Sequence, residues 1–149
     1  MDMARELSTD AEIEALLRSV RTIAVLGIKT EAKASEPAYY VPAYAQSVGF
    51  EIYPVPVYFP EATEILGRPV TRTVSAIGAP IDLVDVFRRP GDLLGHLDDL
   101  LAARPRAVWL QSGIRSDEVT RALVAGGISV VQDRCLLVEL RTRGIRATR

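Results

Sequence analysis

The stretch from Thr22 to Pro37 constrains the fold more than any other part of the chain. It opens with an apolar, β-branched run over 22–28, which carries Gly27 near its end. A run that is apolar on both faces is typical of a parallel strand covered by helices on both sides. A polar loop follows, and then a helix-like segment that either begins at Ser35 or Pro37 and kinks at Pro42, or begins only at Pro42. The stretch predicts the first βα unit of an α/β fold.

The junction between this strand and this helix suits a phosphate group. Gly27 lets the backbone turn sharply, and it lets a ligand approach the chain closely. The first turn of the following helix presents free N–H groups and the positive end of its dipole. We therefore predict that the fold binds a nucleotide-like ligand at this loop.

The rest of the chain repeats the alternation of strand and helix. This rhythm indicates a Rossmann-like, doubly wound, parallel five-stranded sheet in a three-layer α/β/α single domain. Numbered along the chain, we predict the strand order 3-2-1-4-5, with a ligand outside the carboxyl ends of the strands, at the switch point beside strand 1. Strands are predicted over 22–28, 50–56, 81–87, 107–111 and 128–132, and helices within 8–20, 35–47, 73–77, 90–103 and 116–125. The single domain spans 1–149, with an N-terminal helix in 1–21 and a basic, frayed tail over 141–149.

Composition excludes several classes of function. The formal net charge of −1 gives no electrostatic reason to expect nucleic acid. Cys135 and His96 are the only residues of their kinds, so we expect neither an intramolecular disulfide nor a Cys/His metal cluster. We find neither the basic start and apolar core of a signal peptide nor an apolar run that could span a bilayer. A cytoplasmic protein that does not contact a membrane is expected.

The loops at the predicted carboxyl edge carry cations, prolines and glycines rather than a catalytic set. We predict that His96 lies on a helix away from this edge, as a surface residue, so no Ser-His-Asp set forms there. The edge also lacks a pair of carboxylates for acid–base work. We therefore do not expect an enzyme. The loops are 27–30, 54–57, 87–89, 111–114 and 133–135.

A test for NAD fails on two features. Dinucleotide-binding loops carry the pattern Gly-x-Gly-x-x-Gly, and an acidic residue ends the second strand. Gly27 has no second or third glycine, and the second strand ends in Pro54-Val55-Pro56. Lys29, Arg88 and Arg89 instead suit a ligand with several phosphates.

Over residues 22–139 the chain resembles the small stand-alone CoA-binding proteins. Their Rossmann-type domain is shared with the N-terminal domain of the succinyl-CoA synthetase alpha chain. The specific parts of the resemblance are the run Val84-Asp85-Val86-Phe87-Arg88-Arg89-Pro90 and the sequence Asp133-Arg134-Cys135. Weaker parts are Ile23–Gly27, Tyr53–Val55, Ile65–Gly67 and Val108–Ile114.

The resemblance implies coenzyme A or acyl-CoA as the ligand, with its adenine and phosphates held by the loops after strands 1, 2 and 3. It implies no catalysis, because the synthetases need a further domain with a phosphorylated histidine. The chain departs from the family in a longer loop with Glu31 and Glu36, and in Leu140, where the family usually has a histidine. The predicted ligand-binding residues are Gly27, Ile28, Lys29, Thr30, Pro54, Val55, Pro56, Val86, Phe87, Arg88, Arg89, Gln111 and Gly113.

Plainer interpretations stand beside these. Lys29, Arg88 and Arg89 are also the kind of loop residues that are simply solvated. Cys135 is expected to be a semi-buried core thiol, with a mixed disulfide to CoA as a minor alternative, and Trp109 is expected in the core. Two other functions remain open: a small NAD(P)-using oxidoreductase, and a regulatory or interaction subunit whose nucleotide site is empty.

Overall fold

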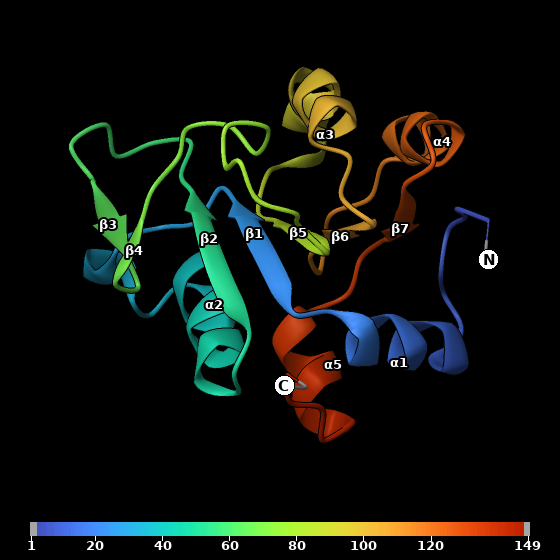
Figure 1. Cartoon of the computed structure of the whole chain (residues 1–149), viewed down its shortest axis with the longest axis horizontal. Coiled ribbons are helices and arrows are strands. Elements are labelled where there is room, and N and C mark those ends of the chain that lie inside the picture. Colours follow the sequence, from blue (N-terminus) through green and yellow to red (C-terminus); the bar gives the residue numbers. More distant parts are fainter. Residues whose placement is uncertain (1–2, 148–149) are drawn as a thin grey trace.

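The computed structural model describes residues 3–147 and confirms the three-layer α/β/α fold (Figure 1). The strands of the main sheet are β1 (Thr22–Leu26), β2 (Glu51–Val55), β5 (Leu83–Val86), β6 (Ala107–Leu110) and β7 (Ser129–Val131). The helices are α1 (Asp10–Ser19), α2 (Pro37–Ser47), α3 (Leu97–Ala103), α4 (Asp117–Ala125) and α5 (Leu136–Thr142). Short elements are the 3₁₀ helices η1 (Glu31–Lys33) and η2 (Pro90–His96) and the hairpin strands β3 (Glu64–Ile65) and β4 (Arg68–Pro69).

The sheet is parallel throughout, but its strand order differs from the predicted one. The order is β2-β1-β5-β6-β7, which is 2-1-3-4-5 along the chain rather than 3-2-1-4-5. Strand β5 therefore pairs with β1, and β2 lies at the edge of the sheet. The point at which the order reverses falls between β1 and β5, so it still lies beside β1.

Pro54 gives the physical reason why β2 is an edge strand. Its carbonyl oxygen accepts a hydrogen bond of 3.1 Å from the N–H of Thr71, on the side away from β1. The N–H and C=O of one strand residue point to the same side, so the outer side of β2 lacks the donor that a further strand needs. The order 3-2-1 required another strand on that side. The β3–β4 hairpin flanks β2 there instead, and Arg68 Nε donates to the carbonyl oxygen of Ile52 at 3.1 Å.

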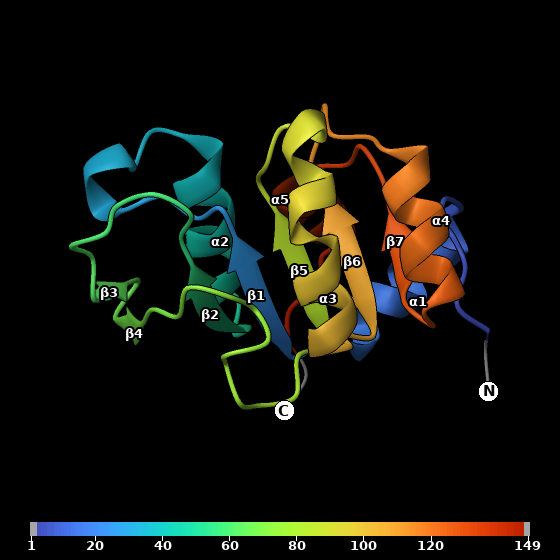
Figure 2. The same cartoon turned by 90° about the horizontal axis from the view of Figure 1, so that it is seen from above.

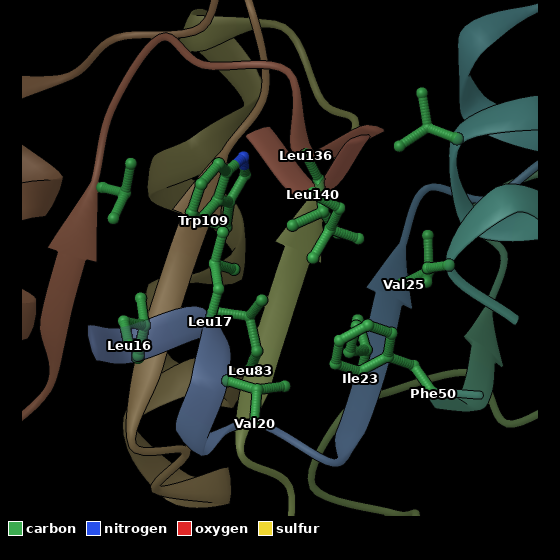
Figure 3. Close-up of a cluster of buried hydrophobic side chains, with 14 of the residues drawn as sticks. Leu16, Leu17, Val20, Ile23, Val25, Phe50, Leu83, Trp109, Leu136 and Leu140 are labelled. Carbon is green, nitrogen blue, oxygen red and sulfur yellow. The ribbon is translucent and has the colours of Figure 1, made fainter. Parts of the chain in front are cut away.

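The two faces of the sheet are covered by different helices. Helices α1, α2 and α5 pack on one face, and η2, α3 and α4 pack on the other (Figures 1 and 2). On the first face Trp109 is fully buried, and its indole N–H donates to the carbonyl oxygen of Arg134 at 2.8 Å. Figure 3 shows Leu136 and Leu140 of α5 close to Trp109. The expected core position of Trp109 is confirmed.

Local signals determine most of the helix ends. Helix α1 begins at a capping box in which Thr9 and Glu12 each bond the other's backbone N–H, at 3.2 and 3.1 Å. Helix α2 begins at Pro37 and continues through Pro42, so Pro42 does not start it. The predicted helix over 90–103 is a 3₁₀ segment followed by a short α-helix.

Two sequence expectations about irregular segments are wrong. Residues 73–77 form turns and bends rather than a helix, and Asp99 accepts the N–H groups of Val74 and Ser75 at 2.8 and 3.0 Å. The tail is not frayed over its described part, because Ile145 is buried and Ala147 N–H donates to the Val48 carbonyl oxygen at 2.9 Å. Residues 148–149 lie outside the described residues.

Candidate functional site

The carboxyl ends of β1, β2 and β5 meet at one edge of the sheet, with Gly27 between them. The N–H of Gly27 donates to the carbonyl oxygen of Val55 at 2.9 Å. Its φ is +87°, a left-handed conformation that favours glycine. A Cβ at this position would clash with the carbonyl oxygen of Phe87 and lie 3.3 Å from Cδ of Arg88. The backbone of Phe87, directly after β5, therefore occupies the space next to Gly27 that the sequence assigned to an approaching ligand.

Arg88 is more buried than Lys29 and Arg89, and three neighbouring side chains contact it. Its Nε donates to Nε2 of His96 at 3.1 Å. One terminal nitrogen lies 3.5 Å from the hydroxyl of Tyr58, and the other lies 3.5 Å from a carboxylate oxygen of Asp92. The guanidinium also lies 5.5 Å from the centre of the Tyr58 ring, within cation–π range. Only 14% of the Arg88 side chain is exposed.

The position of His96 corrects a sequence expectation. His96 is half-buried and bonds to Arg88 at the carboxyl edge, so it is neither remote from this edge nor a surface residue. The reason is local: η2 begins at Pro90, directly after the Arg88-Arg89 pair, and folds back beside it. The sequence signal was the spacing of Asp92 and His96 after Arg88, four and eight residues along a segment that begins with proline.

The other two predicted cations have different environments. Arg89 is 84% exposed, and its Nε donates to Asp92 at 3.2 Å. Lys29 forms an ion pair with Glu36, the residue before α2. The hydrogen bond from Lys29 is the largest cause that lowers the pKa of Glu36. Glu31 does not face the edge, because its carboxylate accepts the N–H of Leu66 in the hairpin turn at 2.8 Å.

Several predicted site residues turn their side chains into the protein. Ile28, Val55 and Val86 belong to the hydrophobic core, so they can offer a ligand only backbone atoms. Pro54 and Pro56 are also buried, whereas Thr30 and Phe87 are half-buried at the edge. These residues line the edge with apolar or uncharged groups and contribute no charge to it.

Gln111 and Gly113 belong to a separate half of the carboxyl edge, over β6 and β7. Gln111 is buried, and its side-chain oxygen accepts the N–H of Leu136 at 3.0 Å. The N–H of Gly113 donates to a carboxylate oxygen of Asp133 at 2.6 Å. Both residues therefore connect loops to one another rather than facing Gly27 and Arg88. Cys135 is half-buried, as expected.

A loop over 57–62 borders Arg88, and only Val57 of this loop belongs to the loops that the sequence placed at the carboxyl edge. Arg72 organises this loop by donating to four carbonyl oxygens, at 2.9 to 3.3 Å. Phe59 adopts a left-handed φ of +64°, and the Tyr58 side chain is left 60% exposed above Arg88. No simple sequence pattern identifies an arginine that binds carbonyl groups ten to fourteen residues earlier.

Asp85 is the one buried carboxyl among the described residues that has no hydrogen-bond partner. It lies on β5, paired in register with Val25 and Trp109, and is fully buried. Burial raises the pKa of its carboxyl well above the usual range. Burial therefore favours the neutral form of this carboxyl, which lies inside the core rather than at the edge.

Two absences among residues 3–147 bear on other functions. These residues contain no group of three or more His, Cys, Asp or Glu side chains placed to hold a metal ion. Among the same residues, no helix combines the length and the apolar character needed to cross a membrane.

A surface hollow of about 500 Å³ opens over the β6 and β7 half. It is lined by charges of both signs, among them Arg115, Arg134, Asp133 and Glu139.

The fold is that of a single Rossmann-like α/β domain, and a basic edge lies at the point where its strand order reverses. The family whose model matches the chain is described as the CoA binding domain, and the match covers residues 21–141. The chain belongs to this CoA-binding domain family, as the resemblance predicted.

Individual relatives agree with this assignment. The uncharacterised protein YneT of Bacillus subtilis (strain 168) is 32% identical over 128 residues, which cover 86% of this chain and 91% of YneT. The structure of cell-free ID.343 from Thermus thermophilus is 42% identical, with a TM-score of 0.82, over 91% of this chain and 98% of that one.

A larger enzyme contains the same fold as one part. The dinucleotide-forming acetyl-coenzyme A synthetase 1 of Ca. Korarchaeum cryptofilum, in complex with phosphate and ADP, matches 84% of this chain with a TM-score of 0.67. The match covers 28% of the synthetase chain at 20% identity. This likeness shows the fold alone.

Proposed function

We propose that this chain binds coenzyme A or acyl-CoA, without catalysis, at the carboxyl ends of β1, β2 and β5. Membership in the CoA-binding domain family supports the ligand. The observation that carries the location is Arg88, which is 14% exposed and held beside Gly27 where the strand order reverses. Ligands of open α/β sheets bind at such a reversal.

The donors of Arg88 support a phosphate as the group that it recognises. Its Nε is bonded to His96, but the two terminal nitrogens make only long contacts of 3.5 Å. These nitrogens together carry four N–H groups, which suit the charge-assisted, paired hydrogen bonds of a phosphate. Arg89 adds positive charge that is open to solvent at the same edge. A ligand with several phosphates is attracted to such a patch.

The same contacts support binding rather than chemistry. His96 accepts from Arg88, and Asp92 pairs with both Arg88 and Arg89. The titratable groups around the proposed phosphate position are thus engaged with one another. We place this binding in the cytoplasm, the compartment in which a lone thiol such as Cys135 stays reduced.

Calorimetric titration with CoA, dephospho-CoA and NAD tests the ligand. We expect micromolar-class affinity for CoA, a lower affinity for dephospho-CoA, and a much lower affinity for NAD. Equal or stronger binding of NAD would contradict the proposal. Acetyl-CoA incubated with the protein should be recovered intact, at the rate seen without protein, and its turnover would contradict the absence of catalysis.

One observation favours the alternative of an interaction subunit with an empty site. Lys29 forms an ion pair with Glu36, so a carboxylate of the protein already balances the positive charge that the sequence assigned to a phosphate. Native mass spectrometry of protein purified from cells separates the two functions. A retained mass that matches CoA supports the main proposal, and a bare chain supports the alternative.

A further inference from the structure

His96 is the hydrogen-bond partner of Arg88, and the direction of that bond defines the state of its imidazole. A guanidinium is always protonated and only donates, so Nε of Arg88 is the donor. Nε2 of His96, 3.1 Å away, must therefore be the acceptor. His96 is then neutral, with its proton on Nδ1. Arg88 is positioned by a group that loses its acceptor as soon as it is protonated.

The surroundings of His96 hold it in this neutral form. Burial is the largest cause that lowers the pKa of His96, and the charge of Arg88 lowers it further. The two acids near the imidazole, Asp99 and Asp92, act in the opposite direction. Asp99 is engaged by the N–H groups of Val74 and Ser75, and Asp92 is shared between two arginines.

We propose that His96 is the positioning residue of Arg88 and that it takes up one proton when a phosphate-bearing ligand binds there. This inference rests on the proposed function. A phosphate on Arg88 brings up to two negative charges next to the imidazole and so favours the imidazolium form. The proton comes from solvent and adds to Nε2, and no covalent bond changes. The Nε–H of Arg88 is then released to the phosphate, so affinity for CoA rises as the pH falls.

The chain allows an unusually direct experiment, because His96 is its only histidine. The imidazole signals in a proton NMR spectrum therefore need no assignment. In the free protein we expect a pKa below the ordinary value, and Arg88→Gln should raise it. The control Arg115→Gln, over the β6 and β7 half, should leave it in place. Saturation with CoA should raise the pKa of His96 in the natural chain.

Calorimetry measures the same linkage as affinity. If binding raises the pKa of His96 by one unit, affinity gains about tenfold as the pH falls across the titration. The phosphate of CoA also titrates near pH 6, so the natural chain is compared with His96→Gln. Glutamine can accept the Arg88 bond through its side-chain oxygen but cannot take up the proton. The pH dependence and the proton uptake, measured in buffers of different ionisation enthalpy, should both fall in this variant to the contribution of the CoA phosphate alone.

The possible outcomes separate this inference from the proposed function. If CoA binds but does not raise the pKa of His96, or if His96→Gln keeps the full pH dependence, the inference is overturned and the function stands. If Arg88→Gln leaves the free His96 pKa unchanged, the coupling is overturned without reference to any ligand. If the free-protein titrations behave as expected but CoA binds at no pH, the proposed function and the proton uptake both fail.

Discussion

The two halves of the carboxyl edge contain similar residue types but use them differently. Over β1, β2 and β5, the terminal nitrogens of Arg88 make only contacts of 3.5 Å to the protein. Over β6 and β7, the polar groups of Gln111 and Gly113 are committed to internal bonds of 3.0 and 2.6 Å. At these residues, the first half keeps hydrogen-bonding capacity for a ligand, whereas the second half uses it to join loops.

This difference explains why a position at the carboxyl edge is not sufficient for a binding role. The switch-point rule selects a region, and tertiary contacts select the residues in it that still have donors. The following five experiments test that distinction, in decreasing order of expected effect.

The largest effect is expected from Gly27→Val, compared with Gly113→Val. Both glycines have a left-handed φ, +87° and +83°, which costs a side chain about 1–3 kcal/mol. Only at Gly27 would the new side chain also meet the backbone of Phe87, for a further cost of about 1–3 kcal/mol. Denaturant unfolding should show the larger loss for Gly27→Val, and only this variant should lose affinity for CoA. Equal losses in both properties would contradict the division of the edge.

Asp85→Asn tests the buried carboxyl beneath the meeting point of the halves. Because the folded pKa of Asp85 is raised, the folded chain keeps a proton that the unfolded chain releases above about pH 4. The natural chain therefore loses stability as the pH rises toward the folded pKa, by up to about 1.4 kcal/mol per pH unit. Asparagine does not ionise, so the advantage of the variant should grow with pH in urea unfolding. The exposed control Asp98→Asn should follow the natural chain, and a constant difference would refute the assignment.

Arg88→Gln should weaken CoA binding by about 10- to 150-fold, which corresponds to the 1.5–3 kcal/mol of a charge-assisted hydrogen bond. Arg89→Gln should cost less, because its side chain is 84% exposed. The matched control in the other half is Arg115→Gln, which should bind CoA as the natural chain does. Calorimetric titration measures all three, and a larger loss for Arg115→Gln than for Arg88→Gln would reverse the two halves.

Gln111→Leu should change stability without changing affinity for CoA. The substitution removes the acceptor of the buried Leu136 N–H, which costs about 1–3 kcal/mol. Thermal unfolding and titration on the same sample separate the two properties. Loss of CoA affinity in a folded variant would return Gln111 to the ligand site, as the sequence first predicted.

The smallest effect is expected from Glu36→Gln. It removes the internal carboxylate that pairs with Lys29 and so frees a cation at the first loop. CoA affinity should rise by a small factor, because both side chains are partly exposed and solvent screens their attraction. Glu31→Gln is the control, since Glu31 bonds to Leu66 in the hairpin instead. An unchanged affinity for Glu36→Gln would place the phosphates away from Lys29.

Elements that depend on neighbouring residues were predictable from the sequence. The apolar runs match all five strands within two residues at each end, and the helix predicted within 8–20 contains α1. The strand order was not predicted correctly, although Pro54 carried the relevant signal. To infer the strand order from Pro54, one must know on which side of β2 its N–H is missing. That side depends on the register of β2 with β1.

Strand periodicity and local motifs involve few residues at short range, so they sufficed to predict the class of fold, the family, and Gly27 and Arg88 as residues of the edge. The partners of those residues emerge only when distant segments of the chain meet. His96 reaches Arg88 because η2 folds back beside the end of β5. The side-chain oxygen of Gln111 accepts the N–H of Leu136, which lies twenty-five residues later in the chain. Whether a donor or acceptor remains free for a ligand depends on contacts between segments that are distant in the sequence. Composition and the spacing of residues do not reveal those contacts.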